Sequence, residues 1–219
     1  MTNGPTRVPL NFTYANRSNP DLLLELGRTL CNLISVAPAG HGFLKRITAK
    51  KRIFREPREA GSVQNTLNKF AKAVHESQSG AFLACVVGGK MSEGINFSDD
   101  LARLVVVVGM PYPNPNDPEL QERMSYMRQQ KGAMTSDQYL ETLCMRAVNQ
   151  SIGRAIRHRD DYASIVLVDE RYTRPSIQQQ IPSWIRESTK IAGSFGEAYA
   201  ALTRFYKVPR LNPAAASSH

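Results

Sequence analysis

The chain has 219 residues and 24.4 kDa, a length that favours one large domain. Hydrophobic residues make up 42% of it, which supplies a core and excludes disorder as the dominant state. Lys and Arg number 28 against 19 Asp and Glu, so the net charge of +9 favours polyanionic partners such as nucleic acid or nucleotide phosphates. Neither a run of about 18 apolar residues nor a basic leader followed by an apolar stretch is present, so the sequence predicts no membrane-spanning helix and no secretory signal.

Three cysteines, Cys31, Cys85 and Cys144, lie more than fifty residues apart, without a C-x-x-C pair or a nearby histidine at ligand spacing. The pattern predicts no metal site and no disulfide framework. Each cysteine is expected as a small buried side chain, in a protein kept in a reducing compartment.

The first part of the chain predicts two helices separated by a basic segment. Residues 1–17 are polar and irregular, and Ser18–Asp21 starts a helix whose leucines recur every three to four residues until a Pro-Ala-Gly stop. Apolar residues at the same spacing predict a second helix over 62–75. The basic segment, residues 45–58, has seven basic side chains, one acid (Glu56) and little strand character. It is either a phosphate-contacting or nuclear-import patch or a solvated surface.

Three apolar runs of strand length follow, at 81–87, 104–108 and 164–168. Each is apolar on both faces, as in a parallel sheet that helices cover on both sides. Further helices are expected over residues 117–130, 137–157 and 195–206. The order predicts an α/β layered domain, with a disordered tail at 208–219.

Gln150, Gly153, Arg154 and Arg157 form the pattern Q-x-x-G-R-x-x-R near the end of one predicted helix. Helical spacing of 100° per residue places Gln150, Arg154 and Arg157 on one narrow face beside the apolar stripe. Two guanidiniums and an amide there are donors suited to phosphate oxygens, and such arginines neutralise a departing γ-phosphate. The alternative is the basic solvent face of an amphipathic helix.

A glycine-rich segment, Gly88–Phe97, follows the first predicted strand. Ligands bind at the carboxyl ends of strands in open α/β sheets, because backbone N–H groups there are offered to phosphates. The segment is not a Walker A loop, since Ala84 and Met91 stand where that motif needs Gly and Ser or Thr. A tight turn without a ligand is the alternative.

A third segment, Ile165–Glu170, resembles the strand and acidic pair of a Walker B motif. No P-loop precedes it, so we expect Asp169 and Glu170 to be polar strand ends or ion-pair partners of Arg171 and Arg174.

Taken together, G-K-M-S-E-G-I-N-F-S-D, G-M-P-Y-P-N, N-Q-S-I-G-R-A-I-R-H and S-I-V-L-V-D-E-R-Y resemble the second motor domain of the XPD-like superfamily-two DNA helicases. The resemblance covers roughly residues 10–207 and is densest from Val87 to Trp184. Asn96, where several relatives carry an acid, and the Gly-Lys-Met lead-in are most similar to the branch linked to sister-chromatid cohesion and DNA repair. The resemblance implies a RecA-like, mostly parallel sheet with helices on both faces, in a domain over residues 18–207.

The same resemblance implies roles for individual residues. Gly88–Phe97 matches motif V, which couples the nucleotide to the DNA backbone, with Glu93 and Gly94 at its centre. Gln150, Gly153, Arg154 and Arg157 match motif VI, whose arginines reach the γ-phosphate of ATP held on the other motor domain, with Gln150 orienting them. The DNA-contacting residues are expected to be Lys90, Ser92 and Asn96, with Lys50, Lys51 and Arg52 from the basic segment.

Members of this family are ATP-driven helicases that move five-prime to three-prime on DNA in the nucleus, with an iron–sulfur cluster in the first half. The resemblance therefore implies ATP, Mg²⁺ and DNA as ligands, and cohesion or replication proteins as partners. The chain itself has no Walker A sequence, no D-E-A-H box and no cluster cysteines. ATP and Mg²⁺ would bind through the absent half, no metal site is expected here, and the chain alone is expected not to hydrolyse ATP.

The chain also departs from the family after Pro38–Gly40. There the family has a core strand with an aromatic-Pro-Ser turn and a helix, whereas here Gly42–Leu44 passes almost directly into the basic segment. About 20 residues are missing, so we expect an internal deletion and a sheet one strand short, in a spliced or partial gene product.

Two other classes of function stay open on the sequence. In one, the basic surface belongs to a non-catalytic module that binds nucleic acid or a partner. The other, a small-molecule α/β enzyme, is weak because no nucleophile–base or acid–base set is visible.

Overall fold

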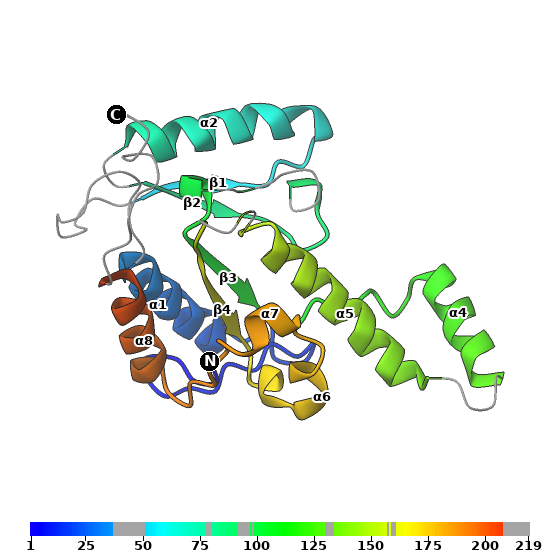
Figure 1. Ribbon diagram of the computed structural model, residues 1–219. Helices are drawn as coiled ribbons and strands as arrows, with labels where there is room; N and C mark the ends of the chain where they lie inside the picture. Colours follow the sequence, from blue (N-terminus) through cyan, green and yellow to red (C-terminus); the bar gives the residue numbers. More distant parts are fainter. Residues whose placement is uncertain are drawn as a thin grey trace.

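The computed structural model describes residues 1–36, 51–77, 80–91, 97, 99–129, 134–156, 158 and 161–207. Within them, helices and short strands alternate (Figure 1). The helices are α1 (Pro20–Val36), α2 (Val63–Glu76), α4 (Pro118–Gln129), α5 (Ser136–Gly153), α6 (Pro175–Gln178), α7 (Ser183–Arg186) and α8 (Phe195–Lys207), with 3-10 turns at Ala60–Ser62, Asp99–Leu101 and Glu170–Thr173.

The described strands form two separate parallel pairs. β1 (Arg52–Arg55) pairs with β2 (Ala81–Ala84), and β3 (Leu104–Val108) pairs with β4 (Ser164–Val168). In register, Arg52 lies opposite Ala81 and Leu104 opposite Ser164. The parallel pairing confirms the predicted α/β class. A sheet divided into two pairs within the described part of the chain agrees with the expected shortage of one strand.

Both faces of the β3–β4 pair are covered by helices, which explains why every residue of these strands except Ser164 is apolar. Alternate side chains point to opposite faces of a strand. Val105 and Val107 pack toward α5 in a core that contains Val148 and Ile152. Residues that point to the other face of the pair, such as Val106, pack toward α1, α8 and the N-terminal segment. This is the arrangement expected of a buried parallel sheet.

The β1–β2 pair is covered by α2, which lies across it in Figure 1. Phe70 of α2 meets Phe54 of β1 edge to face, with ring centroids 5.8 Å apart. Phe70 also lies 6.4 Å from the ring of Phe97, again edge to face. The aromatic contacts thus join β1, α2 and the end of the glycine-rich segment.

The N-terminal segment has no long helix or strand, as predicted, but it is firmly anchored. An isolated antiparallel bridge joins Asn3 to Pro9. The fully buried Glu25 of α1 accepts hydrogen bonds from the Thr6 backbone N–H at 2.6 Å and from its hydroxyl at 2.8 Å. A buried carboxylate is tolerated because these donors replace water. The segment therefore packs as part of the domain.

Four expectations about local structure were wrong. β1 lies inside the basic segment that was expected to lack a strand, and β2 ends at Ala84 rather than near residue 87. α5 ends at Gly153 rather than near residue 157. Cys31 and Cys85 are exposed, and of the three cysteines only Cys144 is buried as predicted. The basic segment has strand structure because its Arg52–Arg55 portion gains backbone hydrogen bonds from β2, a partner that local composition does not reveal.

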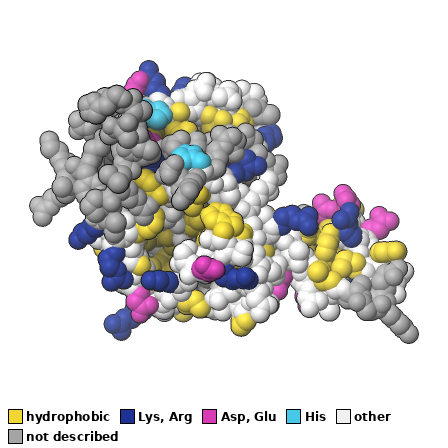
Figure 2. All heavy atoms as spheres, in the orientation of Figure 1, with side chains coloured by type: hydrophobic (Ala, Val, Ile, Leu, Met, Phe, Trp, Pro, Cys, Tyr) yellow, Lys and Arg dark blue, Asp and Glu magenta, His cyan; other side chains and the backbone are white. Residues whose placement is uncertain are grey.

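Helix α4 and the N-terminal part of α5 form an arm that extends away from the body, whereas the C-terminal part of α5 packs in the core (Figure 1). Figure 2 shows hydrophobic side chains on this arm between basic and acidic ones. Tyr126 and Met134 are among its exposed apolar residues. α5 begins with a capping box, in which Thr135 and Gln138 each accept the other's backbone N–H. The described helices include none long and apolar enough to cross a membrane.

Candidate nucleotide and nucleic-acid surface

The glycine-rich segment begins as a tight turn after β2, residues 86–91, which we call the glycine turn. Gly88 has a φ of +76°, a conformation that residues with a Cβ rarely adopt. The Gly89 N–H donates to the Val86 carbonyl at 2.9 Å, which closes the turn. Lys90 is exposed, whereas Met91 is fully buried and anchors the far end. The sequence prediction of a tight turn at the carboxyl end of a strand is therefore confirmed.

Glu56, an acid directly after the neighbouring strand β1, holds this turn. The Glu56 carboxylate accepts the Val86 N–H at 2.8 Å and the Met91 N–H at 3.2 Å. Its own backbone N–H donates to the Ala84 carbonyl at 3.0 Å and extends the ladder between β1 and β2. One of the backbone donors that the sequence suggested for a phosphate, the Met91 N–H, is thus already bound to a carboxylate.

The second glycine of the turn is explained by the same acid. A Cβ built on Gly89 would lie 2.5 Å and 2.6 Å from the two carboxylate oxygens of Glu56. No larger residue fits there unless Glu56 moves. Although Cys85 is exposed as a residue, partial desolvation of its thiol, with a smaller contribution from the Glu56 charge, raises the pKa of the thiol to about 11.

The carboxyl end of α5 carries the predicted arginine motif. Gln150 and Gly153 are exposed, and Arg154 is the half-buried C-cap residue, with φ −85° and ψ −15°. Because α5 ends at Gly153, helical spacing does not extend to Arg157. The prediction that Gln150, Arg154 and Arg157 share one helix face is therefore wrong. Arg157 lies outside the described residues.

The glycine-rich segment and the arginine motif meet at their backbones. The Phe97 N–H donates to the Arg154 carbonyl at 3.2 Å. Ala155 is buried in a small cluster with Ala102 and Ala163, against which Phe97 and Ile156 pack. The two segments, separated by more than fifty residues in sequence, therefore share one corner of the domain.

The remaining predicted site residues are distributed as follows. Lys51 is half-buried, and burial lowers the pKa of its ammonium group, whereas Arg52 on β1 is exposed. Lys90 points its ammonium toward the Arg58 carbonyl at 3.5 Å. Lys50, Ser92, Glu93, Gly94 and Asn96 lie outside the described residues.

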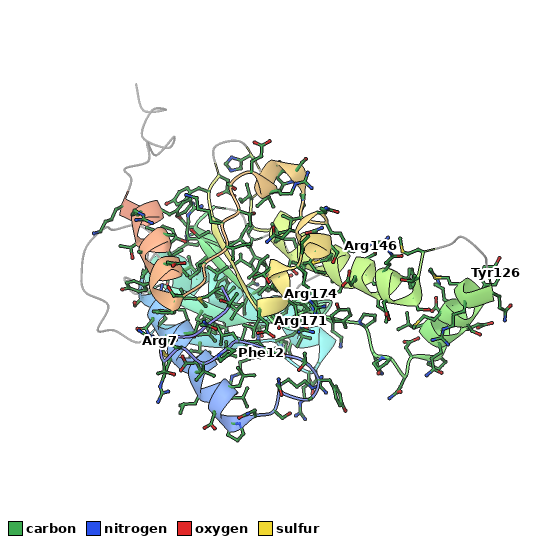
Figure 3. The ribbon with its side chains drawn as sticks, turned by 90° about the horizontal axis from the view of Figure 1, so that it is seen from below. Arg7, Phe12, Tyr126, Arg146, Arg171 and Arg174 are labelled. Carbon is green, nitrogen blue, oxygen red and sulfur yellow. The ribbon has the colours of Figure 1, made fainter. Side chains whose placement is uncertain are left out.

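The acidic strand end after β4 is structural. Asp169 is fully buried and binds Arg171, with Oδ1 accepting from Nε at 2.8 Å and Oδ2 from Nη2 at 2.8 Å. Oδ2 also accepts the Phe12 N–H at 3.1 Å, and Figure 3 shows Phe12 and Arg171 at this junction. Glu170 accepts instead from the Asn11 amide. The predicted ion pair of Asp169 with Arg171 is confirmed.

Sequence reasoning missed Glu56 as a site residue. Its partners lie 30 and 35 residues further along the chain, so no local pattern connects them. The available signal was its position as the single acid among seven basic residues at 45–58. Among the side chains that the structure places, no three His, Cys, Asp or Glu are grouped so as to hold a metal ion.

The chain belongs to the helicase C-terminal domain family, whose match covers residues 38–188. Its fold is similar to that of a solved XPD helicase, with a TM-score of 0.59 at 21% identity over 78% of this chain and 32% of that one. The divided parallel sheet is thus that of a RecA-like helicase domain.

Among curated relatives, the chain is 45% identical to the ATP-dependent DNA helicase DDX11 of Mus musculus, over 94% of this chain and 26% of the relative. It is 41% identical to the ATP-dependent DNA helicase chl1 of Schizosaccharomyces pombe, over 96% of this chain and 28% of the relative. The chain therefore spans about a quarter of the length of these relatives. The resemblance to the cohesion-linked branch of XPD-like helicases is confirmed.

Proposed function

We propose that this chain is the second motor half of an ATP-dependent five-prime to three-prime DNA helicase. In this role Arg154 and Arg157 reach the γ-phosphate of ATP held on a first motor half, Gln150 and Gly153 shape their approach, and the Gly88–Phe97 loop couples ATP to DNA. DNA is the proposed partner and the nucleus the proposed location, because the curated relatives are named as DNA helicases.

The observation that carries the proposal is the hydrogen bond from the Phe97 N–H to the Arg154 carbonyl. It connects the end of the loop proposed to contact DNA with Arg154, the first arginine of the motif. One hydrogen bond therefore separates the two backbones, so a displacement of one can act directly on the other. Chains of hydrogen bonds of this kind are one physical means by which ATP state and DNA position can be coupled.

The chemistry assigned to the arginines is electrostatic. Charge spreads over the γ-phosphoryl oxygens as the bond to the β-phosphate breaks, and a planar guanidinium offers several fixed donors to them. Arg154 fits this role because the end of α5 and the buried Ala155 fix its backbone. Mg²⁺ is assigned to the first motor half together with the ATP phosphates that it bridges.

Contacts to DNA are proposed through Lys90, Ser92 and Asn96 in the loop, and through Lys50, Lys51 and Arg52 in the basic segment. The exposed Arg52 and Lys90 support phosphate contacts, which carry no sequence information. Binding should therefore depend on salt, with log K falling by about 0.7 per phosphate contact against log salt on single strands.

The proposal is tested by joining this chain to the first motor half of the mouse relative and measuring ATP hydrolysis stimulated by single-stranded DNA. Arg157→Ala and Arg154→Ala should each lower the rate of the chemical step by about 10³- to 10⁵-fold, and Arg→Lys should restore little. Arg146→Ala, an exposed arginine two turns earlier on α5, is the matched control and should stay near the parent rate. Arginine variants that retain the rate within about threefold would contradict the proposal.

A chimaera that binds DNA without hydrolysing ATP would favour the non-catalytic binding module instead. The same assay therefore separates the two functions.

A further inference from the structure

Glu56 occupies a position that a simple DNA-binding surface would avoid. Its carboxylate binds the backbone of the glycine turn at Val86 and Met91, the second of which follows Lys90 directly, and Glu56 itself belongs to the basic segment proposed to contact phosphates. A negative charge at such a place repels a polyanion. Its presence there calls for a role other than charge.

The geometry of the turn indicates that role. One carboxylate oxygen holds the N–H of Val86, the first residue of the turn, and the other holds the N–H of Met91, the last. The carboxylate also packs directly on Gly89, where a Cβ would have no room. Both ends of the turn and its middle are thus fixed by one side chain that projects from the end of β1.

We propose that Glu56 is a positioning residue that holds the glycine turn so that Lys90 meets a phosphate of bound single-stranded nucleic acid. This inference rests on the proposed function, in which the turn contacts DNA. Hydrogen bonds to a charged acceptor are stronger than neutral ones, so the carboxylate is better suited than an amide to hold two N–H groups. A glutamine keeps the shape but has one acceptor oxygen, and its NH₂ group would face the second N–H.

The two possible roles of Glu56, as a charge or as a positioning residue, predict opposite changes in DNA affinity for Glu56→Gln. If Glu56 acts only as a charge, its removal near a polyanion should tighten DNA binding. If it positions Lys90, its removal should weaken binding by about two- to fivefold, the loss expected for one solvent-exposed ion pair. The salt slope should also become shallower by about 0.7.

The experiment measures the fluorescence anisotropy of a labelled oligo-dT strand titrated with the 219-residue chain at several salt concentrations. The set comprises the parent, Glu56→Gln, Lys90→Gln and the double variant. Glu59→Gln is the matched control, because Glu59 is an exposed acid three residues away. We expect Glu56→Gln to bind more weakly, Glu59→Gln to bind as the parent or slightly more tightly, and the double variant to bind no more weakly than Lys90→Gln.

The double variant separates positioning from a general structural role. A purely structural role would cost the same affinity with or without the Lys90 ammonium, so additive losses would overturn the inference. Equal or tighter binding by Glu56→Gln would overturn it as well. If the parent itself shows no salt-dependent binding of oligo-dT, the proposed DNA contact fails and the inference with it. If the parent binds oligo-dT and Glu56→Gln binds equally well, the proposed DNA contact stands and only the role of Glu56 is refuted.

A second measurement needs no variant and stays informative if Glu56→Gln does not fold. Amide hydrogen exchange at Val86 and Met91 in the parent should be slow, and should remain slow when oligo-dT is bound. Faster exchange at both amides on binding would mean that DNA displaces the carboxylate. That result would overturn the positioning role.

Discussion

The buried ion pair at the end of β4 provides the sharpest stability prediction, for Asp169→Asn. The Asp169 carboxylate accepts four hydrogen bonds, from the backbone N–H of Arg171 at 2.9 Å, from Nε and Nη2 of Arg171 at 2.8 Å each, and from the Phe12 N–H at 3.1 Å. Asp169 is 0% exposed and the Arg171 side chain 10%. Arg171 Nη2 also donates to the Phe12 carbonyl at 3.2 Å. The pair therefore ties the N-terminal segment to the sheet.

Asparagine retains the size of the side chain but leaves the guanidinium without a counter-charge and turns an NH₂ group toward its donors. Removing one partner of a buried pair costs about 3–5 kcal/mol, because the other charge stays desolvated. For a chain of this length, 1 kcal/mol corresponds to about 2–4 °C in the melting temperature. Asp169→Asn should thus lower the melting temperature by about 6–20 °C. The loss of about 3–5 kcal/mol is a large part of the roughly 5–15 kcal/mol by which a folded domain is stable.

The assay is thermal and urea unfolding followed by circular dichroism. Glu119→Gln is the matched control, since Glu119 pairs with Arg123 at 3.5 Å with side chains 85% and 58% exposed. Such an exposed pair is worth about 0–1 kcal/mol. Asp169→Asn combined with Arg171→Met should cost less than the two single changes added together, because no unpaired charge remains. A loss below about 1 kcal/mol for Asp169→Asn would refute this account of the pair.

Four further predictions follow from other parts of the domain. Gly109→Ala should destabilise by about 1–2 kcal/mol in urea unfolding, because φ is +71° and a Cβ would lie 3.1 Å from that of Phe12; an unchanged midpoint would refute it. In a Cys31→Ser background at pH 8, iodoacetamide should alkylate Cys85 about a hundredfold more slowly than N-acetylcysteine, since its pKa is raised to about 11, and Glu56→Gln should speed the reaction. Burial raises the pKa of the Tyr206 hydroxyl from its ordinary value near 10 to about 12. The protonated hydroxyl therefore contributes stability that is fully present below pH 10 and is lost as the pH rises toward 12, and this alkaline loss of stability should be smaller in Tyr206→Phe. Restoring a strand–helix unit of about 20 residues after Gly40 should raise the melting temperature, and an equal melting temperature would contradict the missing-strand interpretation.

The long helices and the inner strands could be predicted because burial leaves a local periodic pattern. β3 and β4 have the predicted bounds because both faces are covered, so all of their residues except Ser164 are apolar. α1 begins at Pro20 and α8 at Phe195, as the start signals and the three-to-four spacing indicated. β1 was missed because Arg52, Ile53 and Arg55 are exposed and its hydrogen-bonding partner begins about thirty residues later.

The site was predictable only as far as its residue types are chemically distinctive. Glycines at a strand end and spaced arginines indicated phosphate contacts, and the structure places the end of the first segment against the second through Phe97 and Arg154. The helix face was extended too far because α5 ends at Gly153, with Arg154 as its C-cap, before it reaches Arg157. Glu56 depends on contacts across two strands and a turn, which no short window of sequence contains.

The central claim is that this chain completes an ATP site that lies on another motor half. It is tested most directly by steady-state ATP hydrolysis, measured with and without single-stranded DNA, for the 219-residue chain alone and for the chain joined to the first motor half of the mouse relative. The account predicts no appreciable hydrolysis by the chain alone, because catalysis needs a phosphate-binding loop and a Mg²⁺ site, and DNA-stimulated hydrolysis once the halves are joined. Turnover by the purified chain alone that Arg157→Ala abolishes would contradict it.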